Sequence, residues 1–309
     1  MENNTQLKEM IRSMVIDILQ GQKQEMASSQ PIKQAPRGQV EPGVFDTVDE
    51  AIQAAKAAQA RFEDCTLATR EKVIADIRAA MRPRVQELAQ KTVDETGMGR
   101  VADKVLKLNL TLDKTPGVED LVTECETGDN GMTLYELSAY GVIGAVTPST
   151  NPAETLICNT IGMLAAGNAV FFSVHPGAKH LSRLLVSELN QIIAKSIGIE
   201  NLIVTLREPS IESAQEMMLH PDVSLLVVTG GPGVVKQALQ SGKKVIGAGA
   251  GNPPAFVDET ADIKKAAQDI VLGASLDNNI LCIAEKSVVA MRQIEPQLVQ
   301  EMVKAGRSE

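Results

Sequence analysis

The sequence is poor in aromatic residues and in basic charge. Its 309 residues include no tryptophan, two tyrosines and five phenylalanines, so the core must be built mainly from aliphatic side chains and methionine. The 30 Lys and Arg residues are outnumbered by 39 Asp and Glu residues, which gives a formal charge of −9. A nucleic-acid surface needs a basic stripe, and electrostatic attachment to anionic lipid needs basic residues as well. The composition therefore argues against both kinds of partner.

Long apolar runs and paired cysteines are also missing. The sequence contains no run of eighteen apolar residues, the length expected of a transmembrane helix, so no such helix is predicted. Acidic Glu2 and Glu9 and the lack of a continuous apolar segment argue against a secretory signal. The four cysteines form no CxxC pair, and the three histidines complete no zinc pattern. We expect neither disulfides nor a metal site, which fits a reducing cytoplasmic setting.

Residues 1–21 predict an amphipathic helix, and residues 22–40 predict a linker. The apolar side chains of the helix recur at intervals of three and four residues; they are Leu7, Met10, Ile11, Met14, Val15, Ile18 and Leu19. The following residues are polar and contain prolines and glycine, as flexible linkers do. A tethered apolar face at residues 5–20 needs a surface to cover it. A partner protein and the rest of this chain are the two alternatives.

Beyond residue 40 the pattern predicts an α/β fold. Helical stretches fill residues 47–112, and nothing in them indicates chemistry. Short apolar strands then alternate with helices, at residues 140–146, 167–172, 202–205, 223–228 and 244–247. Strands that are apolar on both faces and alternate with helices form a doubly wound parallel sheet. A helix at 262–272, a strand at 287–290 and a helical tail at 295–309 are predicted beyond this sheet, and the chain length favours two domains.

Three loops are expected at the carboxyl ends of these strands, where such sheets bind their ligands. They begin at Thr147, Ser173 and Thr229. The glycines of the third loop would let backbone amides approach a phosphate, although a purely structural turn is an equal alternative. Asn151, in a proline-rich loop, has an amide that could stabilise an oxyanion. His175 could contact a ligand or serve the structure alone.

Cys282 is the cysteine whose neighbouring residues favour a nucleophilic role. It is flanked by apolar residues and preceded by Asn278 and Asn279, whose amides could donate hydrogen bonds beside the sulfur. A partly dry pocket with such donors favours a thiolate, whereas a cysteine taken alone is more often a buried structural residue. Residues 247–254 carry almost no side chains, so the backbone there must pass very close to another group.

Together these motifs resemble the aldehyde dehydrogenase superfamily, and more closely the CoA-acylating propionaldehyde and acetaldehyde dehydrogenases of bacterial microcompartments. The resemblance runs from about residue 40 to the end of the chain. It is carried by residues 146–152 (VTPSTNP), 174–179 (VHPGAK), 228–235 (VTGGPGVV), 247–254 (GAGAGNPP) and 277–286 (DNNILCIAEK). The N-terminal helix and linker resemble the encapsulation peptide that docks these enzymes inside the protein shell.

The resemblance implies an NAD-binding domain at residues 41–247 and the start of a catalytic domain at 248–309. Cys282 would attack the aldehyde. Asn151 and the backbone amide of Cys282 would hold the oxyanion, with Thr150 as a competing candidate because Asn151 is offset by one position from the family pattern. A hydride would pass to NAD+, and CoA would take the acyl group from the Cys282 thioester. The implied cofactor-binding residues are Thr147, Pro148, Ser149, Thr150, His175, Pro176, Gly177, Gly230, Gly231, Gly233, Val234 and Gly249.

Departures from the hydrolytic relatives refine this expectation. Those enzymes carry a water-activating glutamate where this chain has Gly247, Ala248 and Gly249, and a lysine where it has His175. Without a base for water, the thioester is expected to wait for CoA.

The family's chain also continues beyond residue 309, through the rest of the aldehyde pocket and an oligomerising arm. This sequence is therefore expected to be a fragment or a truncated product of a homo-oligomeric enzyme of the microcompartment lumen. The alternatives are a non-catalytic module that binds nucleotide and shell protein, an acetaldehyde-specific enzyme, and a hydrolytic aldehyde dehydrogenase.

Overall fold

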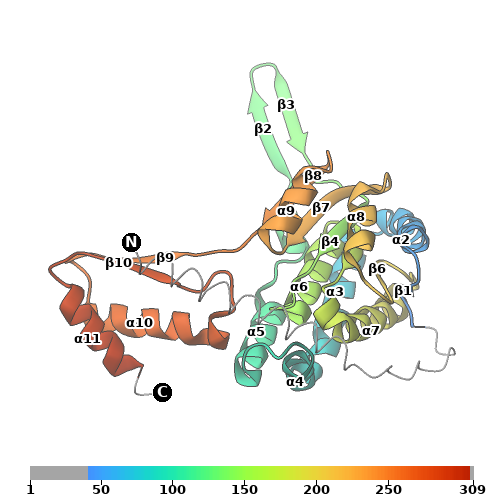
Figure 1. Cartoon of the computed structure of the whole chain (residues 1–309). Coiled ribbons are helices and arrows are strands. Elements are labelled where there is room, and N and C mark those ends of the chain that lie inside the picture. The colour runs from blue at the N-terminus through green and yellow to red at the C-terminus, as the bar shows by residue number, and fades with distance from the viewer. Residues whose placement is uncertain (1–40, 307–309) are drawn as a thin grey trace, which may run out of the picture. The chain divides into compact units, whose positions relative to one another are not determined.

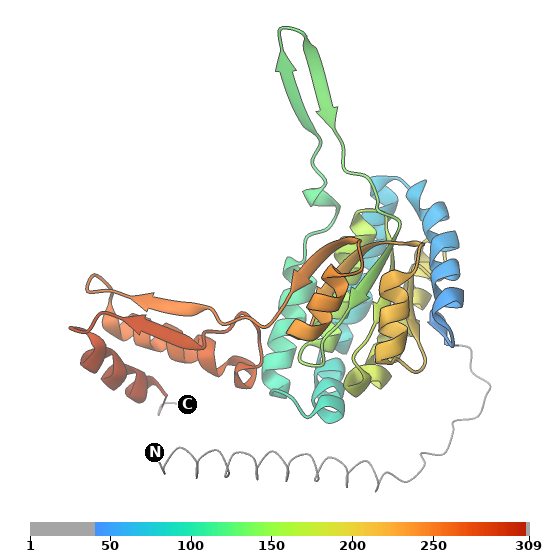
Figure 2. The ribbon, with the colours of Figure 1, turned by 45° about the horizontal axis from the view of Figure 1, so that its top comes forward.

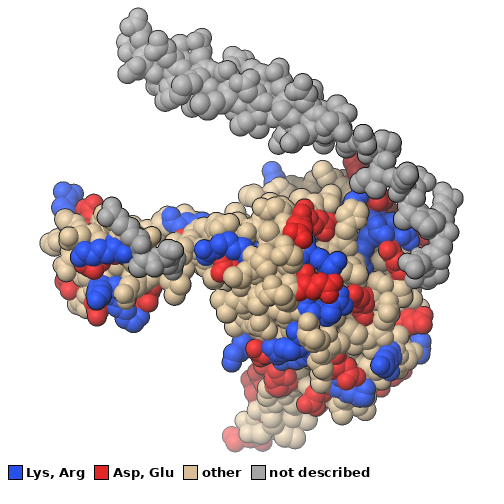
Figure 3. All heavy atoms as spheres, turned by 90° about the horizontal axis from the view of Figure 1, so that it is seen from below, with Lys and Arg blue, Asp and Glu red and all other residues tan. Residues whose placement is uncertain are grey.

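A computed structural model describes residues 41–306. The predicted helix at 5–20 and the linker at 22–40 lie outside the described residues. Among the described residues, no helix is both long and apolar enough to cross a lipid bilayer. On the face shown in Figure 3, acidic and basic side chains are interspersed rather than gathered into a basic stripe.

The fold is organised around a six-stranded parallel sheet (Figure 1), which confirms the predicted α/β class. Its strand order is β1-β6-β5-β4-β7-β8. The strands are β1 (Val44–Phe45), β4 (Val142–Val146), β5 (Ala169–Ser173), β6 (Ile203–Leu206), β7 (Val223–Thr229) and β8 (Lys244–Ala248). Every residue of β5 and β6 is buried, as expected when helices cover both faces of a sheet.

Helices cover both faces of this sheet (Figure 2). On one face α2 and α8 pack against the strands; on the other α6 and α7 do, with α3, α4 and α5 packed outside them, and α9 contacts β7 and β8. The bounds are α2 (Val48–Glu63), α3 (Leu67–Met81), η1 (Arg82–Arg84), α4 (Val85–Thr96), α5 (Val101–Lys114), η2 (Val118–Asp120), α6 (Pro152–Ala165), η3 (Pro176–Ala178), α7 (Lys179–Ile197), α8 (Ile211–Leu219) and α9 (Pro232–Leu239). The short helix η1, which contains Pro83, separates α3 from α4.

A β-hairpin that the sequence pattern did not predict lies between α5 and β4. Strands β2 (Glu124–Gly128) and β3 (Gly131–Tyr135) pair antiparallel, and every residue of both is exposed. Because neither face is buried, the hairpin has no need of the alternation of apolar and polar residues that usually marks a strand. The exposed apolar side chains Met132, Leu134 and Tyr135 lie on it.

The last part of the chain forms a second, smaller sheet. Strand β9 (Pro254–Val257) pairs parallel with β10 (Ser287–Ala290), and α10 (Ile263–Ser275), η4 (Leu276–Asn279) and α11 (Glu295–Ala305) accompany them. β9 was not predicted, because its first two residues, Pro254 and Ala255, continue a glycine- and proline-rich segment. The buried apolar cluster of this region consists of Val257, Ala267, Ile270 and Leu298.

Candidate active site

The three predicted loops follow three neighbouring strands, β5, β4 and β7. From β4 the chain proceeds to β5 and then β6 on one side, whereas β7 and β8 lie on the other side. The gap between β4 and β7 is therefore the point at which strand order reverses, and ligands of open α/β sheets bind there, outside the carboxyl ends. The loops predicted to begin at Thr147 and Thr229 flank this point, although Thr229 itself is the last residue of β7.

The loop after β4 is tied to the neighbouring strand. The backbone N–H of Thr147 donates to the carbonyl of Ser173 at 3.1 Å. The Thr147 hydroxyl is buried and has no hydrogen-bond partner within the described residues. A buried hydroxyl without a partner costs free energy, so an orphan at the ligand edge suits a bound group that supplies the missing bond.

The loop after β7 leads into the N-terminus of α9. Gly231 occupies the N-cap, Pro232 follows it, and the cap uses no side-chain hydrogen bond. A Cβ placed on Gly231 or Gly233 would meet nothing within 4 Å, so space is open beside the first-turn amides. Helix N-termini with free amides attract phosphate, and together with the Thr147 hydroxyl this edge fits a dinucleotide.

His175 and Gly249 lie beside the same edge with less specific roles. The Nδ1 atom of His175 accepts from the backbone N–H of Gly177 at 3.0 Å and so caps η3. Gly230 donates its backbone N–H to the carbonyl of Ala248 at 3.2 Å, and a Cβ on Gly249 would meet nothing within 4 Å. The structural role of His175 is visible, and its exposed ring is available to a ligand.

Asn151 begins α6 but does not cap it with its side chain. Its Oδ1 atom instead accepts a hydrogen bond from the Lys107 ammonium group, and its Nδ2 atom lies 3.3 Å from the Thr150 hydroxyl, to which it donates. The amide nitrogen has two protons, and only one is used in this contact.

Lys107 belongs to a buried ionic cluster that the sequence analysis missed. We define the charged cluster as Lys104 and Lys107 of α5, Glu154 of α6 and Asp277 of η4, all of which are buried. Lys104 Nζ lies 2.9 Å from Asp277 Oδ2 and donates to the Thr150 carbonyl at 2.6 Å. Lys107 pairs with the same Asp277 oxygen and lies 3.2 Å from Glu154 Oε1. Two ammonium groups and two carboxylates thus neutralise one another away from water.

The sequence analysis singled out no residue of α5, yet this helix supplies both lysines of the cluster. A signal was present in the sequence, because Lys104 lies four residues before buried Leu108 and eight before buried Leu112, on one face of the helix. A lysine on a buried helical stripe needs a partner.

Asp277 is the acceptor around which this cluster gathers. Its Oδ1 atom accepts from the backbone N–H of Arg100 at 2.9 Å. Burial alone would raise the pKa of Asp277, but hydrogen bonds from Lys107, the Arg100 backbone and Lys104 outweigh it and hold that pKa below its usual value. Burial lowers the pKa of Lys104.

The backbone from Asp277 to Asn279 is strained. Asp277, Asn278 and Asn279 have φ angles of 50°, 55° and 60°, a left-handed conformation that is uncommon outside glycine. Such strain persists only where the surroundings enforce it and often accompanies functional sites. Here the hydrogen bonds of Asp277 and Asn279 hold the turn, which begins five residues before Cys282.

Cys282 lies in an exposed turn after η4, so the alternative of a buried structural cysteine is wrong. The glycine-rich crossing passes directly against it: a Cβ on Gly251 would lie 2.0 Å from the Cys282 carbonyl oxygen. This confirms the predicted close approach of the backbone. The described residues leave the thiol open rather than in the partly dry pocket that the sequence predicted.

The Asn279 amide does not serve the sulfur as predicted. Its Nδ2 atom donates to the carbonyls of Ala274 at 2.6 Å and Glu285 at 3.0 Å. Its Oδ1 atom accepts from Lys286 at 2.7 Å. These bonds fix the shape of the loop that carries Cys282, which makes Asn279 a structural residue.

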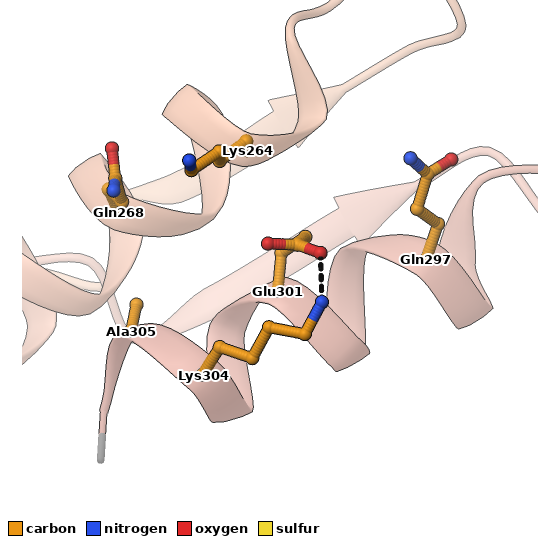
Figure 4. Close-up of a pocket in the computed structure, with 6 residues that line it drawn as sticks. All are labelled: Lys264, Gln268, Gln297, Glu301, Lys304 and Ala305. Atoms are coloured by element: carbon orange, nitrogen blue, oxygen red, sulfur yellow. Dashed lines mark hydrogen bonds and ion pairs between the residues drawn. The ribbon is translucent and has the colours of Figure 1, made fainter. Parts of the chain in front are cut away.

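Two other features carry no catalytic chemistry. Among the described residues, no three or more His, Cys, Asp or Glu side chains gather as a metal site would require. A shallow pocket between α10 and α11 is lined by Lys264, Gln268, Gln297, Glu301, Lys304 and Ala305 (Figure 4), with Glu301 and Lys304 2.6 Å apart. None of the predicted site residues lines it.

Comparison with known sequences places these features in a family. A sequence model of the aldehyde dehydrogenase family matches residues 18–308. The chain is 49% identical over 304 residues to the propanal dehydrogenase (CoA-propanoylating) of Salmonella typhimurium, and the match covers 98% of this chain and 63% of that protein. The chain thus spans less than two thirds of the length of this curated relative.

Solved structures agree. A propionaldehyde dehydrogenase from the fucose utilisation bacterial microcompartment of Clostridium phytofermentans is 51% identical, with a TM-score of 0.83, and covers 86% of this chain and 61% of its own. The propionaldehyde dehydrogenase of Rhodopseudomonas palustris with bound CoA and an acylated cysteine is also 51% identical, with a TM-score of 0.82 and the same coverage of both chains.

Proposed function

The chain belongs to the aldehyde dehydrogenase family, and from this premise we propose that it takes part in the CoA-acylating oxidation of a short aldehyde. Propionaldehyde is the proposed substrate, NAD+ the hydride acceptor and CoA the acyl acceptor. The observation that carries the proposal is the exposed thiol of Cys282 on a loop anchored by Asp277, whose partner Lys107 also holds the Asn151 amide.

The first step is nucleophilic attack of the Cys282 sulfur on the aldehyde carbon. The carbonyl oxygen becomes an oxyanion, and donors aimed at that charge stabilise it. The Nδ2 group of Asn151 has a proton left after its contact with Thr150, and the backbone N–H of Cys282 is the second proposed donor. Thr150 is the alternative to Asn151.

The next steps form and consume a thioester. NAD+, when bound at the β4–β7 edge, supplies the acceptor for the hydride that leaves the former aldehyde carbon. The orphaned hydroxyl of Thr147 and the first-turn amides of α9 are the groups proposed to hold the dinucleotide. The CoA thiol then attacks the acyl carbon and Cys282 departs as thiolate. Transfer to CoA rather than water is favoured because residues 247–251 include no carboxylate.

The proposed setting is the lumen of a bacterial microcompartment, with a shell protein as the partner of residues 5–20. It is supported by the microcompartment origin of the similar Clostridium phytofermentans enzyme and by the amphipathic pattern of these residues. We also propose a homo-oligomer, supported by the exposed apolar side chains of the β2–β3 hairpin. A pull-down of shell proteins with and without residues 5–20 tests the first partner; equal capture would reject it.

The reaction is tested with the complete protein and its Cys282→Ala variant. We expect NADH to form steadily only when both propionaldehyde and CoA are present, and we expect Cys282→Ala to abolish turnover. Cys158→Ala, which removes another exposed thiol, is the control and should retain full activity. Equal steady rates without CoA would instead support the hydrolytic alternative, and faster turnover of acetaldehyde would replace propionaldehyde as the substrate.

Intact-mass measurement separates an enzyme from a binding module. With propionaldehyde and NAD+ but no CoA, we expect one propionyl group on Cys282 and none in Cys282→Ala. A protein that binds NAD+ without becoming acylated would support the non-catalytic alternative. Parallel titrations with NAD+ and NADP+ settle the dinucleotide.

A further inference from the structure

The Lys107 ammonium group contacts both Asn151, the proposed oxyanion donor, and Asp277, which anchors the loop of the proposed nucleophile. Its Nζ atom donates to the Oδ1 atom of Asn151 and to the Oδ2 atom of Asp277, and it lies 3.2 Å from Glu154 Oε1. Two elements therefore converge on one cation: α6, through its N-cap Asn151 and its first-turn Glu154, and η4, which leads to Cys282. Figure 1 shows α5 beside α6 in the fold.

The ammonium group fixes which way the Asn151 amide faces. Lysine has only donors, so it can face only the oxygen of the amide. The nitrogen is thereby turned toward the Thr150 hydroxyl. Without this cation the two ends of the amide, which have the same shape, would be free to exchange. A flipped amide would present its oxygen to an oxyanion and repel it.

The same contact strengthens the amide as a donor. Hydrogen bonds to a charged group are stronger than neutral ones, and linked hydrogen bonds polarise each other. A cation on Oδ1 draws electron density from the amide and makes the Nδ2 protons better donors. Burial of Lys107 keeps water from weakening this effect.

We infer that Lys107 is a positioning residue that orients and polarises the Asn151 amide for the oxyanion while its second bond, to Asp277, sets the loop of the nucleophile. This inference rests on the proposed function and assigns the oxyanion to Asn151 rather than Thr150. Lys107 itself acts through Asn151 and Asp277 and touches no substrate.

Lys104 provides a matched control. It lies on the same helix, is also buried and shares the Asp277 oxygen, but its other bond goes to the Thr150 backbone carbonyl instead of the Asn151 side chain. Lys104→Met and Lys107→Met thus remove the same charge from the same cluster. Only Lys107→Met releases the amide.

The test measures single-turnover NADH formation from propionaldehyde in the complete protein. We expect Lys107→Met to lower the rate at saturating aldehyde by about 10²- to 10³-fold, the loss typical of a missing oxyanion donor, with little change in KM. Lys104→Met should lose at least about tenfold less. The effect of Lys107→Met should not multiply with that of Asn151→Ala, because both remove the same function.

Alkylation of Cys282 by iodoacetamide, followed by peptide mapping, checks the nucleophile separately. That reaction develops no oxyanion, and Lys104 still holds Asp277 in Lys107→Met, so Cys282 should be alkylated at nearly the wild-type rate. Equal rate losses in Lys107→Met and Lys104→Met, or losses that multiply with Asn151→Ala, would overturn the inference in favour of a merely structural lysine.

Lys107→Gln covers the case in which Lys107→Met does not fold. Glutamine keeps a hydrogen-bond donor but not the charge, so its rate should fall between those of the wild type and Asn151→Ala. A wild-type rate in Lys107→Gln would overturn the inference. If Cys282→Ala were active in the same assay, the proposed function itself would fail, so the two failures are distinguishable.

Discussion

The six-stranded sheet region, residues 41–248, and the small-sheet region, residues 254–306, are held together by different forces. The first buries an extensive apolar cluster that includes Phe171, Phe172 and Ile157. The second has four residues in its buried cluster and exposes Phe256 and Ile283, each to 76%. Its contacts with the sheet region include the charged cluster at Asp277 and the bonds of Arg100 and Asp103 to the same segment. The β4–β7 edge therefore belongs to the well-packed region, and the Cys282 thiol to the region with the smaller core.

Placement by charge differs in kind from placement by packing. A buried ion pair adds little net stability, because desolvation offsets the attraction, yet removal of one partner is costly. A buried ionic cluster is therefore stable in one geometry, because other geometries leave a buried charge without its partner. The position of the Cys282 loop therefore depends on few contacts, and a single substitution can remove any one of them.

The largest effect is expected from Asp277→Asn. The change leaves two buried ammonium groups with Glu154 as their only carboxylate in the cluster, and loss of one partner from a buried ion pair costs about 3–5 kcal/mol. Urea denaturation measures it. The control is Asp269→Asn, which breaks the exposed pair with Lys265 and should cost about 0–1 kcal/mol. Equal costs would show that the cluster anchors nothing.

The pH dependence of the stability difference between the wild type and Asp277→Asn tests the same contacts. An Asp in an unfolded chain titrates near about 3.9, and the pKa of Asp277 in the folded chain is lower. Between these values the unfolded chain holds the additional proton, so stability rises with pH. The advantage of wild type over Asp277→Asn should be complete above about pH 4 and should disappear as the pH falls through the folded pKa.

A smaller effect is expected from Gly251→Ala. The new Cβ would lie 2.0 Å from the Cys282 carbonyl oxygen, so one of the two backbones must move. A displacement of about 1 Å at a reacting group can lower the rate about 100-fold. Single-turnover NADH formation measures this loss. Gly162→Ala is the control, because a Cβ there meets nothing within 4 Å; its activity should be unchanged. Full activity in Gly251→Ala would mean that the close approach does not position the thiol.

The smallest effect is expected from loss of a helix cap in each region. Asp262 accepts from the backbone N–H of Lys265 at 3.1 Å and caps α10, and Thr47 accepts from Glu50 at 3.4 Å and caps α2. Each change to alanine should cost about 1 kcal/mol. Hydrogen exchange should quicken locally in α10 for Asp262→Ala, because that region has the smaller core, but α2 should stay protected in Thr47→Ala. Loss of protection across both regions in either variant would show one cooperative unit.

Much of the sheet region could be predicted because its signals are local. Strands β4 to β8 are short apolar runs bounded by glycine and polar residues, and the loop that begins at Thr147 follows from where a strand ends. The close approach at Gly251 followed from a segment that lacks side chains. Each of these properties is contained in about ten neighbouring residues.

The charged cluster could not be predicted in the same way. Lys107 and Asp277 are 170 residues apart, and taken separately each has the character of a solvated surface residue. Only the packing of η4 against α5 makes them partners. The role of Asn279 was mistaken for a similar reason, because the carbonyls that its amide nitrogen reaches, those of Ala274 and Glu285, are brought together by the strained turn.

The long separation between Lys107 and Asp277 in the sequence also affects the order in which parts of the chain fold during synthesis. Ribosomes deliver α5 and α6 well before residue 277, and contacts between distant positions form late in folding because closing the intervening loop is entropically costly. The loop that carries Cys282 is therefore expected to reach its final shape after the six-stranded sheet is complete. In a nascent chain the Cys282 loop thus lacks its final shape until the sheet region has folded.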